Sequence, residues 1–134
     1  MEGRTQLQEA HRMSESIAEV LAGRQVQRIR VGTGLRLELA GAVTVLIDSD
    51  FRLLAAGGVE HFYPQLGTGV TGGLTVLTGS RLTGAVVSPA GGLELAFDCG
   101  RRLVVPPDTA EHPWQVLGPH GPLFTAEPGG YLTG

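Results

Sequence analysis

The feature of this sequence that most restricts its fold is the alternation of apolar and polar residues with a period of two. Residues 35–39 (LRLEL), 43–47 (VTVLI) and 93–97 (LELAF) show it clearly, and Leu103 and Val105 continue it after a DCG turn. Successive side chains of a strand point to opposite faces of a sheet, so this pattern is typical of half-buried antiparallel strands. Short GTG and AGA segments separate the first runs and fit tight turns. The sequence therefore predicts a mainly β fold.

The strand pattern recurs along the chain. Moving residues 23–40 by 56 positions places them on residues 79–96 without a gap, matching Gly23 with Gly79 and one LELA segment with another. Both copies carry apolar residues at steps of three and then two, which predicts a shared bulge or a shared entry from helix to strand. Chance similarity between two β-meanders is the alternative. We expect two related antiparallel meanders about a pseudo-twofold axis, forming a sandwich or a partly open barrel.

One helix is expected, at residues 5–22. Its apolar residues recur at steps of three and four, Thr5 and Gln8 fit a capping box, and Gly23 supplies the stop.

The length of 134 residues fits a single domain. Its expected parts, all in one domain spanning 1–134, are the N-terminal helix at 5–22, a first β repeat at 23–55, a glycine-rich connector at 56–78, a second β repeat at 79–106 and C-terminal β-hairpins at 107–134. Within the connector, residues 74–77 (LTVL) are expected to form one short strand.

The composition removes several classes of function. The net charge is −3 and there is no basic run, so we expect no nucleic-acid partner. The apolar runs are too short to span a membrane, and the charged N-terminal segment does not resemble a secretory signal, so a cytoplasmic protein is expected. The chain has no lysine, which removes lysine-based catalysis and the phosphate-binding P-loop motif.

Residues with reactive side chains do not form a recognisable catalytic or metal-binding motif. The segment GTGVTGG at 67–73 satisfies G-x-G-x-x-G but is followed by a β-rich run where a dinucleotide site needs a helix. The four histidines are not at metal-ligand spacing, and no serine lies in a G-x-S-x-G elbow. Cys99 lies in an FDCGR segment typical of a hairpin turn, with a reactive thiol beside the following arginines as the alternative. We expect no catalytic residue, no cofactor and no metal.

Two segments hold the candidate interaction residues. Phe62 and Tyr63 are adjacent in the connector, where they could anchor a partner, or one ring could pack into the core. The segment VVPPDTAEHPW contains Asp108, Glu111, His112 and Trp114. It either lines a pocket or connects two strands, with the double proline ending one strand and the tryptophan starting the next with its ring toward the core.

The carboxyl-terminal part of the chain resembles a known family. G-x-L-x-L-x-F-x-x-G, L-x-V-P-P-D, a tryptophan, G-P-x-G and P-G-G occur in that order between residues 91 and 130. This combination is similar to a small actinobacterial family classed as a domain of unknown function, closely over 79–132 and more loosely over the first repeat. Family members tend to carry Glu-Ala-Trp, whereas this chain has His112-Pro113-Trp114 with Glu111 one place earlier. The resemblance implies no established activity, although some small relatives look like immunity or accessory proteins.

These observations favour a non-enzymatic protein-interaction module. Its partner is a protein of unknown identity that it neutralises or scaffolds, and pairing of exposed sheet edges would give a homodimer. The alternative is a small-molecule-binding protein or weak enzyme with a pocket near Trp114, using Asp108, Glu111 and His112 as polar groups.

Overall fold

The computed structural model describes residues 6–64, 70–88, 90–107, 113–126 and 132–133. The elements in chain order are α1 (Gln6–Leu21), β1 (Val26–Val31), β2 (Leu35–Leu39), β3 (Val43–Ile47), β4 (Phe51–Ala55), β5 (Gly58–Phe62), the 3-10 helix η2 (Gly72–Val76), β6 (Leu82–Val87), β7 (Leu93–Phe97), β8 (Arg102–Val105), β9 (Trp114–Gly118), β10 (Gly121–Ala126) and β11 (Leu132–Thr133).

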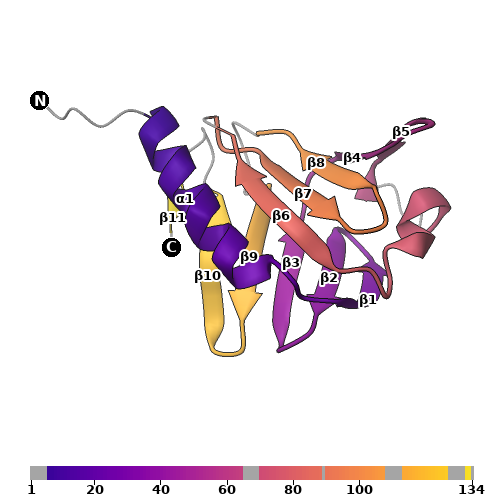
Figure 1. Ribbon diagram of the computed structural model, residues 1–134, viewed down its shortest axis with the longest axis horizontal. Coiled ribbons are helices and arrows are strands. Elements are labelled where there is room, and N and C mark those ends of the chain that lie inside the picture. Colours follow the sequence, from indigo (N-terminus) through magenta and orange to yellow (C-terminus); the bar gives the residue numbers. More distant parts are fainter. Residues whose placement is uncertain (1–5, 65–69, 89, 108–112, 127–131, 134) are drawn as a thin grey trace, which may run out of the picture.

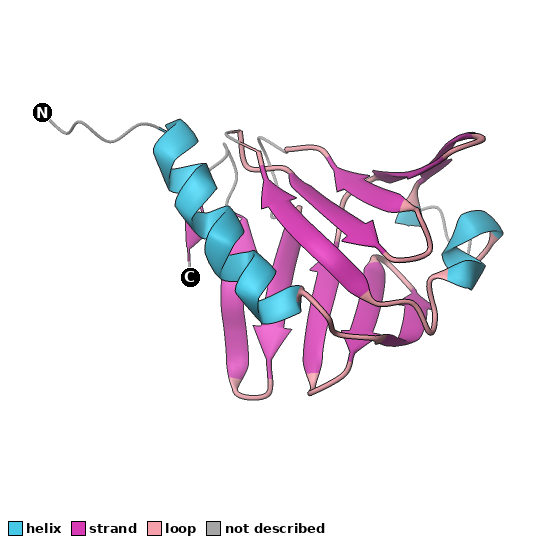
Figure 2. Ribbon diagram, in the orientation of Figure 1, coloured by secondary structure: helices cyan, strands magenta, loops and turns pink. Residues whose placement is uncertain are grey.

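Two antiparallel sheets form a sandwich with α1 at one side (Figures 1 and 2). The six-stranded sheet has the order β1-β2-β3-β9-β10-β11, and the five-stranded sheet has the order β5-β4-β8-β7-β6. The alternating apolar residues of both sheets point inward and form one buried cluster, to which Ile17 and Leu21 of α1 also belong. The predicted mainly β fold with one N-terminal helix is confirmed, as a sandwich.

The chain exchanges a hairpin between the two sheets. Strands β1 to β3 follow one another in the six-stranded sheet, and the next hairpin, β4–β5, then crosses to lie beside β8. Strands β6 to β8 follow one another in the five-stranded sheet, and the next hairpin, β9–β10, crosses back to lie beside β3. Both sheets therefore have the same order of strands, and each half of the chain completes the sheet of the other half.

The first hairpins of the two halves have matching registers. Val31 lies opposite Leu35 in β1 and β2, as Val87 lies opposite Leu93 in β6 and β7. Each hairpin also has a register shift just after the first residue of its first strand, so the predicted bulge is present in both. The residue numbers of matching positions differ by 56 in the first strand of each hairpin and by 58 in the second strand. The difference increases because the turn of the second hairpin is two residues longer.

The ungapped sequence alignment that matched one LELA segment with the other is therefore wrong by two residues in the second strand. Leu37 lies opposite Ile29, and the residue in that place in the other hairpin is Leu95, opposite Ala85. A shift of two residues keeps every side chain on the same face of a strand, so the alternation of apolar and polar residues did not reveal it.

Hydrogen bonds join the two halves where β1 and β6 begin. The Gly23 N–H donates to the carbonyl of Leu82 at 2.7 Å, and the Gly79 N–H donates to the carbonyl of Val26 at 2.8 Å. Both glycines are left-handed, with φ of 83° and 91°, a conformation that glycine adopts without strain. Each follows a helical segment, α1 or η2, so both strands start from a helix end.

The expected strand at 74–77 is wrong, because this segment belongs to η2 and the residue that follows it. Leu74 and Leu77 are both buried and three residues apart, which places them on one side of a 3-10 turn. The Leu77 N–H donates to the carbonyl of Leu74, as such a turn requires. A four-residue segment with apolar residues at both ends fits either a strand or a 3-10 turn, and here it forms the 3-10 turn. Strand β5 also lies in the connector and was not predicted from the sequence.

The helix α1 lies along β6 (Figure 1). Ile17 and Leu21 are fully buried. The Ser14 hydroxyl accepts a hydrogen bond from the Val87 N–H at 2.7 Å and lies 3.3 Å from the Val87 carbonyl as a donor. The helix therefore binds the backbone of an edge strand through a side chain. The expected capping residue Thr5 lies outside the described residues.

Candidate interaction surfaces

Trp114 is part of the core. It begins β9, its side chain is fully buried, and its indole Nε1–H donates to the carbonyl of Gly91 at 2.9 Å. A buried indole whose only donor is bonded has no group left to present to a ligand. Asp108, Glu111 and His112 lie outside the described residues, so a pocket that uses them stays a prediction.

The crossover that contains the double proline contacts the other crossover. Strand β8 ends at Val105, and Pro106 and Pro107 follow it without ladder pairing. The Asp48 N–H, after β3, donates to the carbonyl of Pro113 at 3.0 Å. The two segments that exchange hairpins between the sheets are therefore joined to each other.

The adjacent aromatic residues Phe62 and Tyr63 have different environments. The Phe62 ring stacks on Phe51 with centroids 5.1 Å apart and an interplanar angle of 12°, and it is only 7% exposed. Tyr63 is 43% exposed. It lines a small hollow of about 140 Å³ with Arg52, His61 and Pro106 among its neighbours. One ring fills the core and the other stays on the surface.

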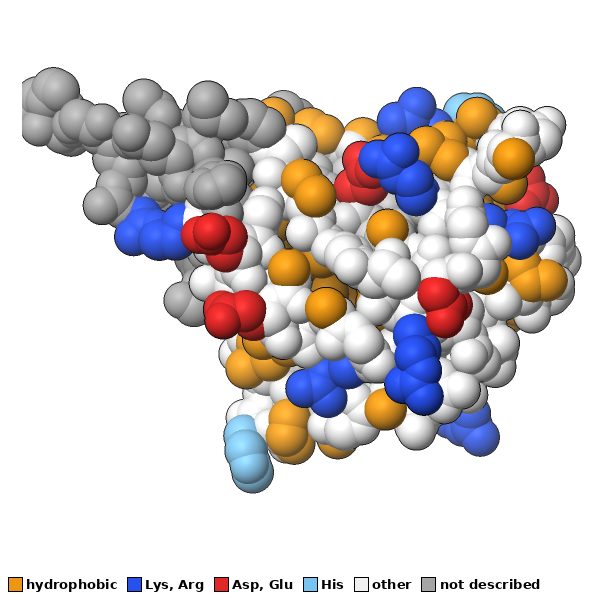
Figure 3. All heavy atoms as spheres, viewed as in Figure 1, with side chains coloured by type: hydrophobic (Ala, Val, Ile, Leu, Met, Phe, Trp, Pro, Cys, Tyr) orange, Lys and Arg blue, Asp and Glu red, His pale blue; other side chains and the backbone are white. Residues whose placement is uncertain are grey.

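The outer face of the five-stranded sheet exposes several apolar side chains. Val59 and Val86 are 52% and 56% exposed, and Leu54 and Val104 are half-buried between them. Together with Tyr63, these residues form what we call the apolar face. Acidic and basic side chains are interspersed with hydrophobic ones rather than gathered in one block on the side seen in Figure 3.

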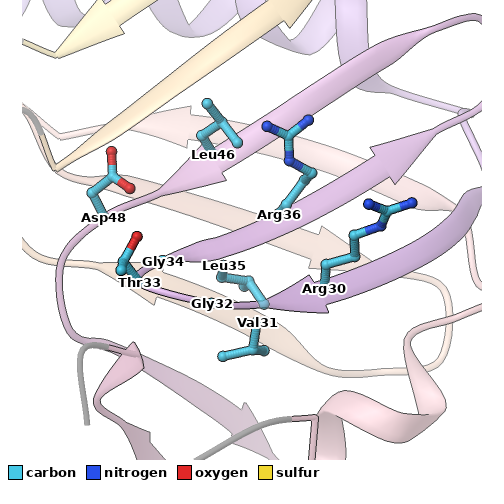
Figure 4. Close-up of a pocket in the computed structure, with 9 residues that line it drawn as sticks. All are labelled: Arg30, Val31, Gly32, Thr33, Gly34, Leu35, Arg36, Leu46 and Asp48. Carbon is cyan, nitrogen blue, oxygen red and sulfur yellow. The ribbon is translucent and has the colours of Figure 1, made fainter. Parts of the chain in front are cut away.

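The outer face of the six-stranded sheet carries a hollow of about 410 Å³ near the turn between β1 and β2 (Figure 4). We call it the arginine hollow; it is lined by Arg30, Val31, Gly32, Thr33, Gly34, Leu35, Arg36, Leu46 and Asp48. Arg30 and Arg36 lie directly opposite each other on the two strands. The side chains of both arginines project from the same face, while Asp48 and Thr33 lie at the other end of the hollow.

The five-stranded sheet has a hollow in the same place, with a volume of about 240 Å³. Under the offsets of 56 and 58, Val86 replaces Arg30 and Glu94 replaces Arg36. The same offset places Val104 where Leu46 lies and Pro106 where Asp48 lies. Neither hollow was predicted from the sequence. Arginine at alternate positions of a strand is typical of any solvated face, and only the strand register brings Arg30 and Arg36 together.

Reactive side chains are dispersed in the described part of the chain. Cys99 is exposed in the turn between β7 and β8, next to Gly100 with a φ of 90°, which fits the hairpin interpretation. His61 lies on β5 and His120 in the turn after β9. Among the described residues, no group of three His, Cys, Asp or Glu is placed to hold a metal ion.

The glycine motif at 67–73 is described only from its fourth residue. Gly67 and Gly69 lie outside the described residues, and Gly72 begins η2, which has five residues. No helix that the structure describes combines the length and the apolar character needed to cross a membrane.

Comparison with known protein families gave a match. A family described as "Family of unknown function (DUF6188)" matches residues 17–134, from the middle of α1 through both sheets. No curated protein and no solved structure matches the chain.

Proposed function

The chain belongs to the DUF6188 family of unknown function, and from this starting point we propose that it is a non-enzymatic protein-interaction module that docks a partner protein on the apolar face. The observation that carries the proposal is the exposure of Val59, Tyr63 and Val86 on one sheet face. Val59 and Tyr63 lie at one edge of this sheet and Val86 at the other, and the charged side chains of Arg52, Arg102 and Glu94 lie on the same face between them. Exposed apolar side chains among charged ones fit a protein contact site, and tyrosine is among the residues that contribute most to binding.

The edge strand β5 supports the same surface. In the part of the chain that the structure describes, β5 pairs only with β4, whereas its counterpart β10 pairs with both β9 and β11. All residues of β5 except Phe62 are exposed. An edge strand of this kind offers backbone donors and acceptors to a partner, which includes a second copy of the chain.

The structure suggests a direct test by site-specific crosslinking. A photoreactive phenylalanine analogue at Tyr63 should crosslink the partner in cells, and the same analogue at Leu123, which is 37% exposed on β10, serves as the matched control. Adding Val59→Asp should remove the crosslink at Tyr63 by placing a charge in the contact. Equal crosslinking from both positions, or none from Tyr63, would contradict the proposal.

Sedimentation velocity distinguishes a second copy from another protein. If the partner is a second copy, a dimer should form at micromolar concentration and be dissociated by Val59→Asp. A strict monomer that still crosslinks through Tyr63 to another protein would remove the homodimer and keep the interaction module.

Three further parts of the proposal concern origin, location and role. The matching registers of the two hairpins support a duplication that gave rise to the internal repeat. We also propose a cytoplasmic location, with which the absence of a membrane-spanning helix among the described residues is compatible. An immunity or accessory role, in which the module neutralises or scaffolds its partner, agrees with a face built for contact.

A further inference from the structure

We propose that the arginine hollow and the adjoining edge of β1 bind an acidic, extended segment of a partner protein. This site lies on the six-stranded sheet and is separate from the apolar face. Three observations carry the inference: the charges on the outer face, the uncovered edge of β1, and the contrast with the other half of the molecule at both places.

The outer face of the six-stranded sheet concentrates positive charge near β1. Arg28, Arg30 and Arg36 lie there with Glu38 as the acidic residue among them in the ladder. The Arg30 Nε is 3.2 Å from the Glu38 carboxylate, and no ion pair joins Arg36 to any described acid. The whole chain nevertheless has a net charge of −3.

The arginine pair is not required by the fold. Like charges directly opposite each other on neighbouring strands destabilise a sheet, and Arg30 and Arg36 are such a pair. At the equivalent places the other hairpin has Val86 opposite Glu94 and keeps the same register. An arrangement that costs stability, and that the fold can do without, points to binding of an anionic group by the two guanidinium groups.

The backbone of β1 also presents unused groups at its outer edge. In β6, the Val87 N–H and carbonyl face away from β7, because both are within hydrogen-bonding distance of the Ser14 hydroxyl. Hydrogen bonds in the two turns show that the backbone groups alternate in the same way in both hairpins. The Gly32 N–H donates to the Gly34 carbonyl, and the Ser88 N–H donates to the Gly92 carbonyl. The N–H and carbonyl of Val31 therefore face away from β2.

Among the described residues, the helix that covers β6 has no full counterpart beside β1. Helix α1 has 16 residues and η2 has 5, although both precede a left-handed glycine. The position that corresponds to Ser14 is Val70, whose side chain cannot hydrogen-bond. No described residue bonds the outward groups of Val31.

A strand added at this edge would meet the arginines. Its backbone would pair with Val31, and every second side chain would lie on the outer face beside Arg28 and Arg30. Carboxylates at these positions would form charge-assisted hydrogen bonds, while the intervening side chains would lie beside the half-buried Ile29 and Val31. An alternating acidic and apolar segment satisfies both requirements.

The probe is the fluorescently labelled peptide acetyl-Val-Glu-Val-Glu-Val-amide, tested by fluorescence anisotropy and by NMR of the full chain. We expect saturable binding with a shift of the Val31 amide signal. Arg28→Gln, Arg30→Gln and Arg36→Gln should together weaken binding by about tenfold or more, as lost charge-assisted contacts do. The matched control is Arg102→Gln, because Arg102 pairs with Glu94 on the other sheet as Arg30 pairs with Glu38; it should leave binding within about twofold.

Three results would overturn the inference. Equal binding of the glutamine peptide acetyl-Val-Gln-Val-Gln-Val-amide would exclude recognition of carboxylates. Equal binding of a peptide N-methylated at alternate amides, whichever alternate set is methylated, would exclude strand pairing. If inorganic phosphate or a short polythymidine displaced the labelled peptide as well as the unlabelled peptide does, the site would be a general anion-binding surface. Crosslinking at Tyr63 is independent of all three, so the two sites fail or succeed separately.

Discussion

The two halves of the molecule share their inward side and differ on their outward side. Both have the same strand order, the same register shift and the same left-handed glycine before the first strand. In one half the outer hollow carries Arg30 and Arg36, and in the other it carries Val86 and Glu94. In β6 the outward backbone groups of Val87 are bonded by Ser14 of α1, while no described residue bonds the matching groups of Val31 in β1. The features that the two halves share maintain the fold, and we expect binding at the features that differ.

A glycine in each hairpin turn shows how close the shared packing is. A Cβ added at Gly34 would lie 2.7 Å from the carbonyl oxygen of Ile47, and one added at Gly92 would lie 2.7 Å from that of Val105. Both obstacles are backbone atoms, which cannot move aside as a flexible side chain can. The same constraint therefore acts at the same place in both halves.

The largest expected effect concerns the first residues of the exchanged hairpins, Trp114 in β9 and Phe51 in β4. Trp114→Ala should lower the free energy of unfolding by about 3–5 kcal/mol, because it leaves a large cavity and an unpaired carbonyl at Gly91. Phe51→Ala should cost somewhat less, about 3 kcal/mol, since only packing is lost. Urea unfolding followed by far-UV circular dichroism measures both. A cost below about 1 kcal/mol for Trp114→Ala would show that the core is not built around this side chain.

The next effect distinguishes the covered edge from the uncovered one. Ser14→Ala should destabilise the fold by about 1–2 kcal/mol, because the Val87 N–H loses its hydrogen-bond partner. The matched variant Val70→Ala, at the corresponding place before η2, should change stability by less than about 0.5 kcal/mol. Thermal unfolding of both variants gives the comparison, and similar costs would mean that the two edges are equally covered.

Substitutions in two equivalent turns should change the stability of the protein in opposite directions. Ala42 and Gly100 occupy the same place between the second and third strands of each half, with φ of 62° and 90°. Ala42→Gly should stabilise the protein by about 0.5–1 kcal/mol by relieving a left-handed alanine, and Gly100→Ala should destabilise it by about 1 kcal/mol. Chemical denaturation provides the values. Two changes of the same sign would contradict the left-handed geometry of one turn.

The smallest effect concerns the arginine pair. Arg36→Glu gives the arginine hollow the acid that Glu94 supplies in the other half, and it replaces a like-charge pair by an attractive one. We expect a gain of a few tenths of a kcal/mol that decreases with added salt. Denaturation at low and high ionic strength checks this. A loss of stability at low salt would show that Arg36 has a structural role.

Much of the fold was predictable because it depends on local patterns. The alternation in 35–39, 43–47 and 93–97 identified the buried face of each strand, and α1 followed from its apolar spacing and the glycine after it. The exchange of hairpins was not predictable, since alternation shows which face of a strand is buried and not which strand lies beside it. Strand β5 was missed because almost all its residues are exposed, so it shows no alternation.

The candidate sites were predictable only in part. The adjacent Phe62 and Tyr63 were identified as either an anchor for a partner or a core contact; Phe62 packs in the core, and Tyr63 is exposed. The arginine hollow depends on a cross-strand register that no short segment contains. Trp114 was recognised both as a candidate pocket residue and as a strand start, and its burial supports the second interpretation.

The central claim is that the outward N–H and carbonyl of Val31 in β1 have no partner among the described residues, while the matching groups of Val87 in β6 are bonded by Ser14. Amide hydrogen exchange of the monomeric protein, measured by NMR, tests it most directly. The Val87 amide, bonded to Ser14, should exchange slowly, and the Val31 amide should exchange at least about tenfold faster. Equal protection of Val31 and Val87 in the monomer would contradict the claim.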